Sequence, residues 1–399
     1  MRIAGIIAEY DPFHNGHAAH IMATKATDGG NATHIVAVMS GSFTQRGEPA
    51  LLSKFHRTEM ALQSGADLVI ELPLPWAMAP AENFAAGGVA ILAALGCVDL
   101  ISFGSECGDL KTLRQLAGLS DMADYRAELQ KQLSNGIPYA AAAQAAAATI
   151  LGENTASALA SPNNTLGIEY LRAVQSQNVS IDAYTLSRQG AKHNDAVACE
   201  NIASASYIRQ LIRQGKTADA TAYMPTKAAH LLLQSIQSQH APIYSEKIET
   251  VIPAILRRMS EDDFSKLPWL SEGLENRLYK AGRCANSYAD LLNAVNTKRY
   301  PAARLRRMVW SAVLGMTGQD IKGLPPYIRV LGMNSRGREI LATASPTLPI
   351  LTKPSQLKEL DDYANRVFQL ETIATDIHAL GMPQPLPCGT DYTNKLIVI

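Results

Sequence analysis

The segment from Pro12 to His17, with the sequence PFHNGH, lies between a run that predicts a strand and a run that predicts a helix. Residues 2–9 are apolar and rich in β-branched side chains, as buried strands are, and residues 16–26 have a helical pattern. Gly16 allows a ligand to approach the backbone, and the helix start offers unpaired N–H groups to an anion. Two imidazoles add donors for phosphate charge. Together these features predict a phosphate-binding turn, whereas the motif by itself also fits a turn glycine between two surface histidines.

The same order of strand and helix continues through the first half of the chain. Further strands are predicted at residues 33–39, 67–72, 97–103 and 181–186, and helices at 54–64, 81–95 and 139–149. This alternation favours a parallel sheet with helices on both faces. We therefore expect an α/β fold with a Rossmann-like parallel sheet, whose ligands bind at the carboxyl ends of the strands.

Beyond Gly215 the strand signals fade, and helical periodicity dominates to about residue 315. The chain has 399 residues, which is more than one ordinary core accommodates. We expect two domains, an α/β domain over residues 1–215 and a mainly helical, basic domain over residues 216–399.

The two parts differ in charge, although the formal net charge of the chain is zero. Residues 1–210 hold 13 Lys and Arg against 19 Asp and Glu, whereas residues 211–399 hold 23 against 17. Within the second part, residues 277–338 carry 12 basic side chains and only two acidic ones. Such a segment fits a polyanion, and a solvated helical surface explains it equally well.

Several other protein classes are disfavoured. No apolar run is long enough for a membrane span, and the start lacks the pattern of a signal peptide, so we expect a cytoplasmic protein without a membrane partner. Five widely spaced cysteines argue against a disulfide framework or a cysteine zinc site. His14, His17 and His20 are spaced three residues apart without a carboxylate to complete a ligand set, so we expect no protein metal site.

A second candidate anion site has the sequence SASYIR at residues 204–209. Hydroxyl groups and free amides at a helix start bind anions, and Arg209, one turn further on, can clamp a phosphate with two N–H groups. Taken alone, this is also the pattern of an ordinary helix cap followed by an exposed arginine.

Together the two segments resemble the HIGH-motif nucleotidyltransferase superfamily. His14 to His17 match its HxGH form, and Ser206 to Arg209 match its later Ser/Thr-x-x-Arg helix start. The resemblance narrows to the bacterial tRNA(Met) cytidine acetate ligases. It is carried by residues 5–17, 38–50, 103–106, 162–170 and 325–331.

The resemblance implies an enzyme that activates acetate with ATP, Mg²⁺ being the expected companion ion, to give acetyl-adenylate. The acetyl group then passes to N4 of the wobble cytidine of elongator tRNA(Met). His14, His17 and Arg209 would be catalytic, the imidazoles at the α-phosphate and pyrophosphate, and Arg209 with the Ser206 helix start at the β- and γ-phosphates. The nucleotide-binding positions carried over are Ile7, Ala8, Glu9, Tyr10, Asp11, Pro12, Phe13, His14, Asn15, Gly16, His17, Ala18, Ala19, His20, Gly104, Asn163, Asn164, Arg188, Ser206 and Arg209.

Some basic and aromatic residues are less specific. Lys54 and Arg57 follow a capping serine on a predicted helix, where contact with water is favoured over contact with phosphate or RNA. Arg46 is a further basic residue to which the sequence assigns no specific role. Trp76 and Trp269 are expected to be core or rim aromatics. Asp11 departs from the asparagine of the family pattern, and its carboxylate would repel a triphosphate unless it faces away or helps to hold Mg²⁺.

The segment 298–310 predicts a helix with an apolar seam and a stripe of arginines suited to RNA phosphates. We expect tRNA to contact Lys298, Arg299, Arg304 and Arg307. Two other functions stay open, a small-molecule adenylyltransferase of the same superfamily and a non-catalytic RNA-binding protein. A homodimer also stays open.

Overall fold

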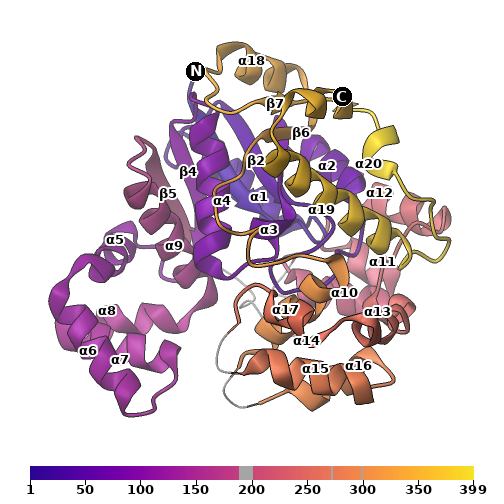
Figure 1. Ribbon diagram of the computed structural model, residues 1–399. Coiled ribbons are helices and arrows are strands. Elements are labelled where there is room, and N and C mark those ends of the chain that lie inside the picture. Colours follow the sequence, from indigo (N-terminus) through magenta and orange to yellow (C-terminus); the bar gives the residue numbers. More distant parts are fainter. Residues whose placement is uncertain (188–200, 271–272, 298–299) are drawn as a thin grey trace.

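A mostly parallel sheet forms the centre of the computed structural model, which describes residues 1–187, 201–270, 273–297 and 300–399 (Figure 1). Its strands are β1 (Ile3–Ala8), β2 (His34–Ser40), β3 (Leu68–Leu72), β4 (Leu100–Ser105), β5 (Asp182–Ser187), β6 (Ile328–Met333), β7 (Ile350–Leu351) and β8 (Ile397–Val398). The strand order is β5-β4-β1-β2-β3-β6-β7, and β8 pairs with β6. Within the described residues β6 is antiparallel to β3, and the other pairings are parallel. The α/β fold and the five strands expected in the first half are confirmed.

Helices surround this sheet. Those of the first half are α1 (Asn15–Lys25), α2 (Lys54–Gln63), α3 (Leu74–Ala77), α4 (Ala81–Ala94), α5 (Leu110–Gly118), α6 (Ala123–Ser134), α7 (Tyr139–Leu151), α8 (Glu153–Ala156), α9 (Pro162–Ser176) and α10 (Ala205–Arg213). Those that follow are α11 (Thr217–Thr221), α12 (Thr226–Gln237), α13 (Val251–Arg258), α14 (Glu261–Ser265), α15 (Leu274–Cys284), α16 (Tyr288–Val295), α17 (Ala302–Leu314), α18 (Ser335–Thr343), α19 (Asp362–Ala379) and α20 (Thr390–Thr393). Short 3-10 helices span Leu119–Asp121, Ser157–Ala160, Ser245–Ile248 and Pro354–Glu359.

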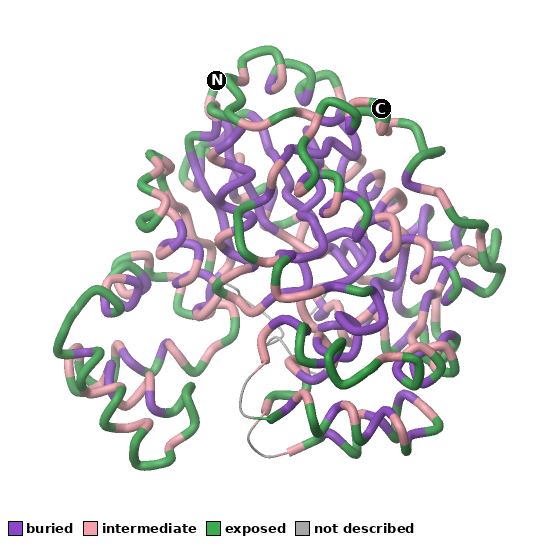
Figure 2. Tube along the Cα trace, viewed as in Figure 1, coloured by how far each residue is buried: buried purple, intermediate pink, exposed green. Residues whose placement is uncertain are grey.

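The two faces of the sheet have separate hydrophobic cores. Along β2, Val36 and Val38 pack into one core with α4, α9 and α19, whereas Ile35 and Ala37 pack into the other with α1, α2 and α12. This alternation follows from the two-residue period of a strand, and both faces are apolar because both are covered. Figure 2 shows the buried residues concentrated at the sheet and the exposed ones on the surrounding helices.

A third core lies among the helices of the second half. It joins side chains of α13, α15, α16 and α17 to Phe43 of the β2–α2 loop and to Leu74 of α3. The helical part therefore packs directly on loops that leave the carboxyl ends of the strands (Figure 1).

The second part of the chain differs from expectation in one respect, since β6, β7 and β8 come from it and join the same sheet. β6 is buried at all six positions, but Arg329 and Gly332 interrupt its apolar pattern. β7 and β8 have two residues each, which is too short for a periodicity signal. The division at 215/216 stays a prediction. Within the described residues, no helix has the length and apolarity that a membrane span requires.

Candidate active site

The side chains of His14 and His17 form a reciprocal cap at the N-terminus of α1. His14 occupies the N-cap position, and its Nδ1 accepts a hydrogen bond from the Gly16 amide at 3.1 Å. The His17 Nδ1 accepts from the His14 amide at 3.2 Å, and the two rings stack with centroids 3.7 Å apart. A neutral imidazole that accepts at Nδ1 carries its proton at Nε2. In the neutral form of either ring, the proton is therefore on Nε2, and Nε2–H is a donor of the kind that binds phosphate oxygen.

Aromatic side chains of the β1–α1 loop support His17. The Tyr10 ring lies 4.8 Å from that of Phe13 and 4.9 Å from the imidazole of His17, and both aromatic residues are buried. Tyr10 has a φ of +50°, a left-handed conformation that is costly for a bulky residue. Strain of this kind persists only where the surroundings hold it, and it concentrates at functional sites.

Asp11 faces protein groups. Its Oδ1 accepts from the Leu51 amide at 2.7 Å, and its Oδ2 lies 3.4 Å from Nη1 of Arg209. The same Nη1 donates to the backbone carbonyl of Asp11 at 2.6 Å. Both carboxylate oxygens are thus engaged, and the charge of Arg209 compensates that of Asp11.

The second motif meets the first across the site. α10 begins at Ala205, because Ser204 is its N-cap and its hydroxyl accepts from the Tyr207 amide at 3.1 Å. The Ser206 hydroxyl, in the first turn, lies 3.4 Å from Nη2 of Arg209. The Asn15 amide donates to the carbonyl of Tyr223 at 2.9 Å, which ties the start of α1 to the segment after α10.

The end of β4 contributes the other predicted nucleotide-binding positions. Gly104 is the penultimate residue of this strand and pairs with Leu186 of β5. The Asn164 oxygen accepts from the amides of Glu106 and Cys107 at 2.8 and 3.1 Å, so this side chain fastens the loop after β4 to the start of α9. The Asn163 side chain donates to the Glu106 carboxylate at 2.7 Å and is less buried than that of Asn164.

Three predicted site residues, Arg188, Lys298 and Arg299, lie outside the described residues. The other two predicted tRNA-binding residues are on α17, where both are partly buried. Nη2 of Arg304 donates to the carbonyl of Trp269 at 2.8 Å, and Nη1 of Arg307 donates to that of Gln45 at 2.9 Å. Burial, with Arg304 and Arg306 nearby, lowers the pKa of Arg307 to about 10. The arginine stripe thus also fastens α17 to neighbouring loops.

The expectation that Lys54 and Arg57 contact water is wrong, because both side chains are fully buried. Arg57 donates to the carbonyls of Glu9 at 2.6 Å and Ser40 at 3.0 Å and also to that of Gly41, so it joins the carboxyl ends of β1 and β2. Local sequence could not reveal this, since β6, α19 and α20, far along the chain, cover this helix start. Trp76 is buried as expected, and Trp269 packs at the edge of the helical core.

Lys54 belongs to a buried cluster of charges that links both halves of the chain. Its Nζ lies 2.6 Å from Glu71 and 2.8 Å from Asp391, while Arg329 contacts the same carboxylates at 2.7 and 2.6 Å. Burial alone would raise the pKa of Asp391, but Lys54 and Arg329 outweigh it and hold the pKa at about 2. Burial and the adjacent Glu71 raise the pKa of Glu371 well above its usual range.

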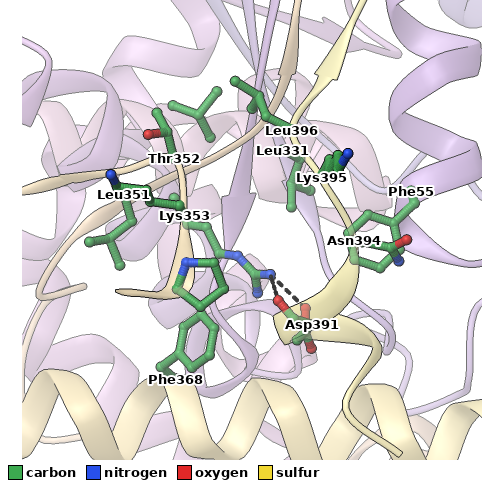
Figure 3. Close-up of a pocket in the computed structure, with 13 residues that line it drawn as sticks. Phe55, Leu331, Leu351, Thr352, Lys353, Phe368, Asp391, Asn394, Lys395 and Leu396 are labelled. Atoms are coloured by element: carbon green, nitrogen blue, oxygen red, sulfur yellow. Dashed lines mark hydrogen bonds and ion pairs between the residues drawn. The ribbon is translucent and has the colours of Figure 1, made fainter. Parts of the chain in front are cut away.

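A cavity of about 30 Å³ adjoins this cluster. Figure 3 shows Asp391 at its floor above Phe368, with Lys353 on one side and Phe55 on the other. A volume of this size has room for one or two water molecules and none for a nucleotide. This cavity is therefore too small to be the nucleotide site, and the HxGH turn with the start of α10 stays the predicted ligand site.

Comparisons with known proteins identify the family of the chain. A family model described as HIGH Nucleotidyl Transferase matches residues 1–389. The chain is 37% identical to the tRNA(Met) cytidine acetate ligase of Acetivibrio thermocellus and 38% identical to that of Thermoanaerobacter sp. (strain X514), with 100% of both chains covered in each comparison.

Two solved structures of Thermotoga maritima TmcAL resemble the fold throughout. The apo form has a TM-score of 0.94, and the form bound with alpha-thio ATP has a TM-score of 0.93. Each is 30% identical in sequence and covers 100% of both chains. The chain is thus an enzyme of the HIGH nucleotidyl transferase family, and within it belongs to the tRNA(Met) cytidine acetate ligases.

Proposed function

We propose that the protein is an ATP-dependent tRNA(Met) cytidine acetate ligase that works through acetyl-adenylate. The observation that carries this proposal is the contact between Arg209 of α10 and Asp11, which lies three residues before the HxGH turn and 198 residues from Arg209 in the chain. The names of the full-length relatives support the tRNA substrate and acetate, and the bound alpha-thio ATP of the Thermotoga maritima structure supports ATP.

In the first step an oxygen of acetate attacks the α-phosphorus of ATP. The bond to the bridging oxygen breaks, and the products are acetyl-adenylate and pyrophosphate. No protein nucleophile is needed, because positioning and stabilisation of charge supply most of the catalysis of phosphoryl transfer. His14 and His17 would donate from Nε2 to the α-phosphate and the leaving pyrophosphate, and Arg209 would hold the β- and γ-phosphates.

In the second step N4 of the wobble cytidine attacks the acetyl carbon, AMP leaves, and N4 loses a proton. The base has to leave its stack to reach the pocket. Lys298, Arg299, Arg304 and Arg307 would contact phosphates of the tRNA. The basic segment of the second half supports this surface, since phosphate contacts supply most of the non-specific affinity for nucleic acid.

Mg²⁺ would be held mainly by the phosphates of ATP and by water, as is usual for this ion. Both oxygens of Asp11 already have protein partners. The described residues contain no group of three or more His, Cys, Asp or Glu side chains that could hold a metal ion. The other proposed nucleotide contacts are the β1–α1 loop, Gly104, Asn163 or Asn164, Arg188 and the Ser206 helix start.

The test is an assay with ATP, magnesium, acetate and tRNA(Met), in which AMP, pyrophosphate and N4-acetylcytidine are measured. We expect all three products, and pyrophosphate only when acetate is present. Adenylation of a phosphorylated cofactor precursor, without a reaction that depends on acetate, would overturn the proposal. Such a result would favour the alternative function, a small-molecule adenylyltransferase of the same superfamily.

Arg209→Gln tests the site itself. We expect kcat/KM for acetylation to fall by about 10²–10³-fold, because a donor to developing charge is lost. The matched control is Arg213→Gln on the same helix, where Arg213 pairs with the exposed Glu246. The control should keep the activity of the unmodified protein, and equal loss in both variants would contradict the assignment of Arg209.

A further inference from the structure

Arg46 reaches the start of α10 from the loop between β2 and α2. Its Nη1 donates to the Ser206 hydroxyl at 3.2 Å, while Nη2 of Arg209 lies 3.4 Å from the same oxygen. Two guanidinium groups therefore converge on one neutral hydroxyl in the first turn of a helix. Like charges placed so close repel each other, and an anion between them relieves that repulsion.

The backbone on both sides of Arg46 is anchored. The Gln45 amide donates to the Glu9 carboxylate at 2.6 Å, and the Gln45 carbonyl accepts from Arg307. Nε of Arg306 donates to the Arg46 carbonyl at 3.0 Å and pairs with Glu48 at 3.2 Å. The loop tip is thus held by the β1–α1 loop on one side and by α17 on the other, so the direction of Arg46 is built into the fold.

The same anchoring occupies the nearby acids. Asp11 binds the Leu51 amide and Arg209, and Glu9 binds the Gln45 amide. Burial and the adjacent Asp11 raise the pKa of Glu9, although the hydrogen bond from the Gln45 amide and the charges of Arg46 and Arg209 act in the opposite direction. The guanidinium groups of Arg46 and Arg209 thus meet at the N-terminus of a helix, beside the HxGH turn, where an anion is favoured.

We propose that Arg46 is a further nucleotide-binding residue, which contacts the β- or γ-phosphate of ATP together with Arg209. This inference rests on the proposed function and deepens it. Because a guanidinium group can bind two phosphate oxygens at once, Arg46 would bind the pyrophosphate portion of ATP, and other residues would bind the adenosine. It would hold the leaving group in line with the attacking acetate.

Arg46→Gln and Arg46→Lys test this proposal when the affinities of the full-length protein for ATP and for AMP are measured by calorimetry. We expect Arg46→Gln to weaken ATP binding by about 10- to 100-fold, as for the loss of a charged hydrogen bond. AMP binding should change less than about twofold, since AMP lacks both outer phosphates. Arg46→Lys should recover part of the ATP affinity because it keeps the charge.

Arg213→Gln is the matched control and should bind both nucleotides as the unmodified protein does. Equal losses for ATP and AMP in Arg46→Gln would mean that Arg46 only supports the loop, and unchanged ATP affinity would mean that it is not a ligand. Either result overturns the inference and leaves the proposed function standing. Failure of the unmodified protein to bind ATP would overturn both.

Discussion

The negative charge of Asp11 opposes the proposed function of its loop, which is to bind the negatively charged triphosphate. Its carboxylate is buried beside Arg209, in the loop proposed to receive a triphosphate. Arg209 has a second anchor, the backbone carbonyl of Asp11, which any side chain at this position would keep. The negative charge is therefore not needed to keep Arg209 in place.

Asp11→Asn should accordingly lower the KM for ATP. Asparagine keeps an oxygen for the Leu51 amide and removes one negative charge near the phosphates. We expect a decrease of about 3- to 10-fold, the scale of one charge acting through a partly screened distance. Steady-state kinetics with ATP as the varied substrate measures it. A higher KM would show that the carboxylate itself positions Arg209 or the metal.

The raised pKa of Glu371 should make the free energy of unfolding depend on pH. Its pKa is raised in the folded protein, so its contribution to stability is complete below about pH 4.5 and is lost as the pH rises through the folded value. Each pH unit in that window costs about 1.4 kcal/mol. Glu371→Gln has nearly the same shape and does not ionise.

We expect the free energy of unfolding of Glu371→Gln to fall less between pH 5 and pH 8 than that of the unmodified protein. Urea titrations at both values measure the difference, and the remaining buried groups are common to the two proteins. A parallel decline in both would show that Glu371 is not the group that titrates.

The connection between β2 and α2 matters at the scale of elements, because it contacts both the site and α17. Gly47 has a φ of +69°, and a Cβ there would lie 2.5 Å from the backbone nitrogen of Arg307. Gly136, between α6 and α7, has a φ of +78°, and its Cβ would meet nothing within 4 Å. Both glycines therefore need a positive φ, but only Gly47 is packed closely against another part of the chain.

Gly136→Ala should lower the free energy of unfolding by about 1–2 kcal/mol, the cost of a left-handed alanine. Gly47→Ala should cost about 1–3 kcal/mol more, because α17 has to move to admit the methyl group. Urea denaturation followed by circular dichroism compares the two. Equal losses would contradict the close packing of this loop on α17.

At the scale of the whole molecule, the sheet and its buried charges join the two halves of the chain. β6 pairs with β3, and Arg329 and Asp391 neutralise Glu71 and Lys54. A chain that ends at residue 215 would expose the edge of β3 and leave Lys54 and Glu71 without these partners. Removing the partner of a buried charge typically costs about 3–5 kcal/mol.

We therefore expect the fragment 1–215 to lack the cooperative urea transition of the full chain. Circular dichroism and nucleotide binding measured on both would test this. A fragment that unfolds cooperatively and binds ATP would support residues 1–215 as an independent domain.

Much of this architecture could be predicted from local sequence. The two-residue period of the strands and the helical periods between them predict the parallel part of the sheet, because burial on each face is encoded residue by residue. The HxGH turn and the Ser206 helix start were recognisable for the same reason, since caps and turns depend on a few adjacent residues.

The sequence by itself determined the alternation of elements, the HxGH and Ser-x-x-Arg motifs and the family. Only the tertiary structure decided that Lys54 and Arg57 are buried, that β6 completes the sheet antiparallel to β3, and that Arg46 meets Ser206. The reason is physical: periodicity states which side of an element avoids water, but the partner that covers it comes from contacts hundreds of residues away. Whether a charged side chain such as Lys54 is buried therefore depends on these distant partners, and the local sequence pattern does not reveal it.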